Sequence, residues 1–220
     1  MLTDTKQKFM TKTFAYTLGV IFLSFVTAVF GAHHFPAVAR MGWIGTIVLT
    51  IAWFIVIYGT QVIAPKSTIL GQIGLCLVGI IAGLFMVSIF VYVPMIFILQ
   101  ALISSILLFL MLIFVGLLTP FDLSRLSTIL YTTLFVIIIV SLVNVFIFHS
   151  SLLSLVISIV SVIIFSIFTA RDAQYLNNLS NAINDSNMDG LAINGAMQLF
   201  LDFYNIFLSI LNIILEMQRD

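Results

Sequence analysis

Residues 69–118 read ILGQIGLCLVGIIAGLFMVSIFVYVPMIFILQALISSILLFLMLIFVGLL, and this stretch decides the class of fold. It contains no Asp, Glu, Lys or Arg, and Pro94 divides it into two apolar runs. Each run is long enough to cross a hydrocarbon core as a helix, which takes about 20 residues. A transmembrane β-strand would instead alternate apolar and polar residues. The stretch therefore predicts two consecutive transmembrane helices.

Similar apolar runs continue on both sides of this stretch. In all, we predict spans near residues 14–32, 43–64, 69–92, 95–118, 128–148, 151–170 and 191–215. The chain is 62% hydrophobic and 7% charged, whereas soluble domains are about 25% charged. All four prolines fall between spans, where the missing backbone N–H breaks no helix inside lipid. We therefore expect an all-α membrane protein with seven transmembrane helices, embedded in a lipid bilayer.

The charges indicate an orientation and exclude one class of partner. Eight Lys+Arg balance eight Asp+Glu, so there is no basic excess for nucleic acid. With the N-terminus in the cytoplasm, the inner segments hold Lys6, Lys8, Lys12, Lys66, Arg125 and Arg171, and the outer segments hold Arg40 and Arg219. This distribution follows the positive-inside rule. We expect a cytoplasmic tail at 1–13, a transmembrane domain at 14–215 and an outer C-terminal tail at 216–220.

The last predicted span carries the only charged residue within the seven spans, Asp202. A carboxylate in a membrane costs roughly 2.5–3.5 kcal/mol unless it is paired, protonated or hydrated. It belongs to a polar stripe with members three or four residues apart: Asn194, Gln198, Asp202, Asn205, Ser209, Asn212 and Glu216. Such a stripe cannot face lipid, so we expect this helix inside the bundle. The alternative reading of its amides is hydrogen bonding between helices.

The sixth span carries a second stripe. Its members share one sector of the helix: Ser151, Ser154, Ser158, Ser161, Thr169 and Asp172. The simpler reading of Asp172 is a charge cluster with Arg171 at a helix end. If Asp172 instead comes within reach of Asp202, the two carboxyl groups cannot both stay ionised in a low dielectric, and they would share a proton. Such a pair would sense pH.

Other signals in the chain are weaker. Residues 185–190 match the first half of a calcium-binding loop, but Ala196 stands where that loop needs a glutamate, which favours a plain turn. Gly79 and Gly83 are spaced for close helix packing. The single Cys76 excludes an internal disulfide. Because metalloprotease, hydrolase and nucleotide-binding motifs are all missing, we expect no enzyme activity, no metal centre and no cofactor.

The segment AMQLFLDFYNIFL at 196–208 resembles the last-helix signature of the Bax inhibitor-1 family, with its Leu-Asp-Phe-x-Asn core. Asp172-Ala173-Gln174 and Asp122-Leu123-Ser124 are similar to two further motifs of that family. The resemblance implies six helices packed around a central seventh. It also implies that Asp172 and Asp202 form a hydrogen-bonded carboxyl pair near the cytoplasmic mouth. In this chain Arg171 replaces the usual aromatic residue, and we expect it to modulate the pair by favouring the ionised form.

The leading prediction is a pH-sensitive cation leak channel, for calcium by resemblance, in a bacterial cell membrane. The pair Asp172 and Asp202 would form the gate, and the candidate pore-lining residues are Asn194, Gln198, Asn205, Ser209 and Asn212. The alternative is a regulator that binds a membrane protease or another membrane protein, without transport, through its N-terminal tail or the link at 171–190. A proton-coupled transporter is a third reading, but the sequence has no inverted repeat to support it.

Overall fold

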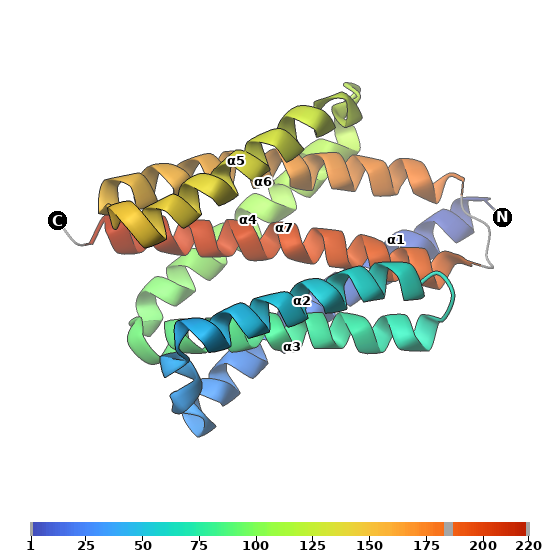
Figure 1. Cartoon of the computed structure of the whole chain (residues 1–220). Helices are drawn as coiled ribbons and strands as arrows, with labels where there is room; N and C mark the ends of the chain where they lie inside the picture. Colours follow the sequence, from blue (N-terminus) through green and yellow to red (C-terminus); the bar gives the residue numbers. More distant parts are fainter. Residues whose placement is uncertain (1, 183–186, 219–220) are drawn as a thin grey trace. The chain divides into compact units, whose positions relative to one another are not determined.

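The computed structural model describes residues 2–182 and 187–218, and in these residues it contains helices and no strand. The long helices are α1 (Leu2–His34), α2 (Trp43–Ile63), α3 (Thr68–Tyr92), α4 (Met95–Leu118), α5 (Ser127–Val143), α6 (Ser151–Ser180) and α7 (Met188–Glu216) (Figure 1). Short 3-10 helices lie at Pro36–Arg40 and Leu123–Leu126, and a π-helical turn lies at Asn144–Phe148. In the described residues, seven helical segments are long and apolar enough to cross a membrane. The predicted all-α class is confirmed.

Three of the helices extend beyond the spans predicted from hydropathy. α1 begins at Leu2 instead of residue 14, α6 continues to Ser180, and α7 begins at Met188. Much of the predicted tail and of the link at 171–190 is therefore helical. A helix satisfies its own backbone N–H and C=O groups, so it can continue past the apolar stretch into polar sequence. Hydropathy therefore predicts only the apolar part of each helix.

The helix boundaries follow local chemistry. Ser67 precedes α3 and its hydroxyl accepts a hydrogen bond from the N–H of Leu70, which caps the helix. Pro94 separates α3 from α4 because it lacks an N–H to continue the first helix. Between α5 and α6, Asn144 holds the turn: its side chain donates to the carbonyl of Ser150 and accepts from the N–H of the same residue. His149 adopts a left-handed conformation there, with φ of 51°.

The chain divides into two compact units. The first contains the chain up to Met95 together with Asn178–Phe200, and the second contains Ile96–Asn177 together with the chain from Leu201. α7 is one continuous helix that contributes its first half to one unit and its second half to the other. Its inward side chains are buried in both halves, including Ile193, Phe200 and Phe207 at 0% exposure. Within each unit, the part of α7 that belongs to it therefore has buried side chains, as the polar stripe predicted.

The first unit packs through small residues, as the sequence indicated. A Cβ on Gly83 would lie 2.4 Å from the carbonyl oxygen of Ser24, so only glycine allows α1 and α3 to approach this closely. Two polar contacts add to this packing. Gln72 on α3 donates to the Tyr16 hydroxyl on α1 at 2.8 Å, and Trp53 on α2 donates from Nε1 to a carbonyl of α3 at 3.1 Å.

The second unit has an apolar core between α5, α6 and the second half of α7. Its buried members are Leu130, Ile164, Phe165, Phe168 and Ile206. On α4, Gly116 sits directly against α6, since a Cβ there would lie 2.1 Å from the carbonyl oxygen of Ala170. Ala170 is followed at once by Arg171 and Asp172. This contact therefore fixes the part of α6 that carries the predicted site.

Candidate functional site

Asp172 and Asp202 are both buried within the second unit. Asp172 lies on α6 with 4% exposure, and Asp202 lies on α7 with 5% exposure. The helices that carry them pack together in the apolar core of this unit, through Phe165 and Phe168 on α6 and Ile206 on α7. The structure thus brings together two residues that the sequence places on separate stripes.

Arg171 binds directly to Asp172. Its Nε donates to Oδ1 of Asp172 at 2.7 Å, and Nη2 donates to the same oxygen. The guanidinium also lies over the rings of Phe168 and Tyr131, at 4.8 and 5.2 Å from their centroids. Arg171 and Asp172 therefore form a largely buried ion pair, and the aromatic rings hold the arginine in place.

The hydrogen bond between the two carboxyl groups that the resemblance implies stays a prediction. Oδ2 of Asp202 is buried and has no hydrogen-bond partner among the described residues. On the other side, Oδ1 of Asp172 accepts from Arg171. A charge-assisted bond to a guanidinium is stronger than a neutral one, so it competes well with Asp202 for the same carboxyl group. The arrangement corresponds to Asp172 paired with Arg171.

Gln174, in the motif at 172–174, hydrogen-bonds to the loop between α4 and α5. Gln174 donates from Nε2 to the carbonyl oxygens of Thr119 and Phe121 at 3.2 and 2.8 Å, and its Oε1 accepts from the N–H of Leu123 at 2.9 Å. Two of the three motifs that carry the family resemblance, 122–124 and 172–174, are thus in direct contact. The sequence analysis missed this contact, since nothing in either motif indicates the other.

The same loop contains a capping carboxylate. Asp122 accepts a hydrogen bond from the backbone N–H of Ser124 at 3.0 Å. Hydrogen bonds from the side chain and backbone of Ser124 lower the pKa of Asp122 below its usual value. Asp122 starts the 3-10 turn before α5, so it supports the loop that Gln174 holds.

The candidate pore-lining residues take different positions. Asn194 belongs to the first unit and donates to the carbonyl of Gln61 at 3.0 Å, and Gln198 in the same unit is half-buried. In the second unit, Asn205 donates to the carbonyl of Leu201 in its own helix at 2.7 Å. Ser209 is half-buried, and Asn212 reaches α6. Their role as a pore lining stays a prediction.

The two polar stripes meet near the start of α6 and the end of α7. Nδ2 of Asn212 donates to the hydroxyls of Ser154 and Ser158 at 2.9 and 2.8 Å. Ser151 donates from Oγ to Oε2 of Glu216. The sequence analysis assigned Glu216 to the polar stripe by its spacing of four residues from Asn212, although hydropathy placed it in the C-terminal tail.

The weak calcium-loop signal lies partly outside the described residues, which include neither Asp185 nor Ser186. Within them, Asp189 accepts from Nζ of Lys12 at 2.5 Å, so this carboxylate joins α7 to α1. The described chain also contains no cluster of three or more His, Cys, Asp or Glu side chains that could hold a metal.

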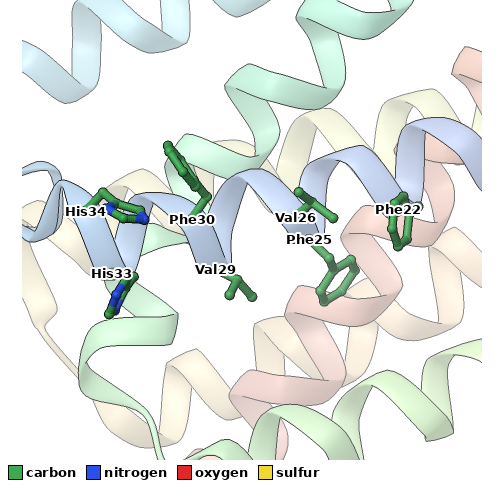
Figure 2. A pocket seen from close by; sticks show the side chains of 7 residues that line it. All are labelled: Phe22, Phe25, Val26, Val29, Phe30, His33 and His34. Atoms are coloured by element: carbon green, nitrogen blue, oxygen red, sulfur yellow. The ribbon is translucent and has the colours of Figure 1, made fainter.

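One apolar groove runs along α1, as Figure 2 shows. It has a volume of about 470 Å³, and its lining residues are Phe22, Phe25, Val26, Val29, Phe30, His33 and His34. Phe22 is 71% exposed and Phe30 is 55% exposed, as expected of side chains that face lipid tails. The groove offers no carboxylate, so the charged cluster of the second unit remains the candidate site.

Comparisons with known proteins agree with the motif assignment. The family model "Inhibitor of apoptosis-promoting Bax1" matches residues 6–220. An uncharacterized membrane protein of Streptococcus pyogenes serotype M3 is 32% identical over 114 residues, covering 52% of this chain and 49% of the relative. The alignment thus spans about half the length of the streptococcal relatives. An uncharacterized protein of Helicobacter pylori is 28% identical over 216 residues, covering 94% of this chain and 85% of the relative. The chain therefore belongs to the Bax inhibitor-1 family.

Proposed function

We propose that the protein is a pH-sensitive cation leak channel whose gate is the carboxyl pair Asp172 and Asp202. The observation that carries the proposal is the burial of two carboxyl groups on α6 and α7 within one unit, one of them bonded to an arginine. Ionisable groups inside a membrane protein are costly and commonly serve ion or proton pathways. A structural role alone would be met by neutral hydrogen-bonding groups.

The gate works by competition for the carboxyl group of Asp172. When the pair shares a proton, Asp172 and Asp202 hydrogen-bond to each other, join α6 to α7 and close the path. When both are ionised, they repel each other, and Asp172 pairs with Arg171. Asp202 then offers hard oxygen atoms to a cation, and Oδ2 already lacks a partner among the described residues. Flux should therefore rise with pH.

The substrate of this channel is a cation, with Ca²⁺ proposed from the family resemblance and from the oxygen chemistry of the pair. We also propose that the protein catalyses no covalent reaction. The positive-inside rule places the N-terminus in the cytoplasm and the C-terminus outside a bacterial cell membrane. In this orientation the gate lies nearer the cytoplasmic side, since Asp172 is close to the end of α6.

The test is Ca²⁺ flux into liposomes that contain the purified protein, measured from about pH 6 to pH 8 because a shared carboxyl proton should titrate in such a window. We expect flux to increase with pH in the wild type. Asp202→Asn, confirmed to be folded, should lose this dependence. Wild-type protein without flux at any pH would refute the channel.

The alternative function is a regulator that binds a membrane protease or another membrane protein. It is expected to act through the N-terminal tail or the link at 171–190. In the tail, Phe9 is fully buried and Lys12 is paired with Asp189. Trimming residues 1–12 would therefore disturb the first unit as well as any docking. A cleaner test exchanges the exposed Lys8 for Gln. Loss of a co-purifying protease in that variant, with no flux in the wild type, would favour the regulator.

A further inference from the structure

We propose that Arg171 is a specificity-determining residue of the cation path, because it neutralises one of the two carboxylates that form the gate. As a result, the path accepts monovalent cations such as K⁺ alongside Ca²⁺. This inference rests on the proposed function, since it concerns the ions between which the channel discriminates. It is tested by a ratio of two fluxes and by binding, so it can fail while the channel stands.

The first observation is the geometry of the ion pair between Arg171 and Asp172. Nε of Arg171 donates to Oδ1 of Asp172 at 2.7 Å, and Nη2 donates to the same oxygen. Both side chains are largely buried, and salt screens buried charges much less than exposed ones. The carboxylate of Asp172 therefore already has a cation in place, and a second cation meets a neutral pair instead of a negative charge.

The second observation is that neighbouring side chains hold the guanidinium group beside Asp172. Cζ of Arg171 lies 4.8 Å from the ring centroid of Phe168 and 5.2 Å from that of Tyr131. On α5, the hydroxyls of Ser127 and Tyr131 accept long hydrogen bonds from Nη1 and Nη2, at 3.5 and 3.4 Å. The planar guanidinium suits stacking and several hydrogen bonds at once. These contacts stabilise the arginine in the position where it neutralises Asp172.

The third observation is the different state of Asp202. Its side chain is buried in the same unit as Asp172, and its Oδ2 has no hydrogen-bond partner among the described residues. A buried ionised carboxylate is costly unless hydrogen bonds or a positive charge compensate it. Asp202 is therefore the carboxylate of the gate that a passing cation compensates.

The selectivity follows from the charge that the ion meets. The two ionised carboxylates of the gate carry a charge of −2, and the guanidinium of Arg171 reduces the sum to −1. A monovalent cation neutralises this sum, whereas a divalent cation leaves an excess positive charge in buried surroundings. The repulsion between a guanidinium and an ion is also proportional to the charge of the ion. Since the affinity of protein sites for Ca²⁺ depends on the number of charged ligands, Arg171 weakens Ca²⁺ binding more than K⁺ binding.

The experiment compares the uptake of ⁴⁵Ca²⁺ with that of ⁸⁶Rb⁺, a tracer for K⁺, into liposomes that contain the full-length protein. Each variant is measured at a pH where its flux is maximal, and we expect both tracers to enter with the wild type. Arg171→Gln should raise the ratio of Ca²⁺ to Rb⁺ uptake at least about threefold, because the positive charge is lost. Tyr131→Leu removes the ring and hydroxyl that hold the guanidinium and should raise the ratio less. Arg125→Gln is the matched control, because Arg125 is an exposed arginine of the same unit, with Asp122 as its partner.

The outcomes for selectivity and for the channel are distinct. A ratio that rises in Arg171→Gln and in Tyr131→Leu, and not in Arg125→Gln, supports the inference. An unchanged ratio in both variants, or a wild type that admits ⁴⁵Ca²⁺ and excludes ⁸⁶Rb⁺, overturns it while the channel stands. Tyr131→Leu decides the question if Arg171→Gln does not fold.

If neither tracer enters at any pH, the proposed function fails, and binding then decides the inference about Arg171. The measurement is equilibrium binding of ⁴⁵Ca²⁺ to the protein in nanodiscs of neutral lipid, with KCl as the competitor. Arg171→Gln should bind ⁴⁵Ca²⁺ more tightly than the wild type and should need more KCl for its displacement. Equal binding and equal displacement in the two proteins would overturn the inference as well.

Discussion

Arg171 and Asp172 are neighbours in the chain and are bonded through their side chains, with Nε of the arginine 2.7 Å from Oδ1 of the aspartate. The ion pair is largely buried, since the side chains of Arg171 and Asp172 are 12% and 6% exposed. A positive charge in this position stabilises the ionised carboxylate. Arg171 thus acts on the group that the proposed gate must protonate.

Replacing Arg171 should move the pH response. In Arg171→Gln the charge that favours ionised Asp172 is lost, so the shared proton is held up to a higher pH. We expect the midpoint of Ca²⁺ flux to move upward by about one pH unit or more. The measurement is flux against pH in liposomes. Arg125→Gln is the control, because Arg125 is an exposed arginine 3.8 Å from its partner Asp122, and it should leave the midpoint in place.

Removing the side chain of Gln174 should destabilise the loop between α4 and α5. Gln174→Ala leaves the carbonyls of Thr119 and Phe121 and the N–H of Leu123 without their partner. We expect a loss of about 1–3 kcal/mol in the free energy of unfolding, measured by denaturant titration in detergent. Gln174→Glu keeps the acceptor for Leu123, but its second carboxylate oxygen repels the two carbonyl oxygens, so we expect it to lose at least as much. Equal stability of Gln174→Ala and of Gln218→Ala, a change at an exposed glutamine, would show that the loop does not depend on these bonds.

A methyl group on Gly116 should disturb the packing of α4 against α6. The Cβ of Gly116→Ala would lie 2.1 Å from a backbone oxygen of Ala170, so one helix must shift. We expect a loss of about 1–3 kcal/mol in stability. Gly59→Ala is the matched control, since a Cβ there meets nothing within 4 Å, and alanine favours the helix by up to about 1 kcal/mol. A Gly116→Ala protein that unfolds at the same temperature as Gly59→Ala would contradict the contact.

Much of the fold could be predicted from hydropathy because lipid leaves the backbone few alternatives to a helix. The span at 95–118 coincides with α4, and the prolines mark the breaks. The extent of α1 could not be predicted in this way. Residues 2–13 are mostly polar, and this part of the helix makes a tertiary contact, the ion pair between Lys12 and Asp189. Sequence patterns do not report contacts between distant residues.

The candidate site, like the fold, could be predicted from the sequence only in part. The spacing of the two stripes correctly indicated that Asp202 is buried and that α6 and α7 share polar faces. The spacing does not predict the hydrogen-bond partner of Asp172, since this residue can bond to Arg171 or to Asp202. The structure has the first arrangement, in which two guanidinium nitrogens reach one carboxylate oxygen. Tyr131 and Phe168, which hold the arginine, carry no distinguishing pattern in a chain with 13% aromatic residues.

The measurement that tests the central claim most directly is Ca²⁺ flux against pH in Asp172→Asn, in Asp202→Asn and in the double variant. If the two carboxyl groups share one proton, either single change should remove the whole pH response between about pH 6 and pH 8, and the double variant should behave like the singles. If each single change removes only a part and the double variant removes the sum, the two groups titrate independently and Asp172 and Asp202 are not a gate.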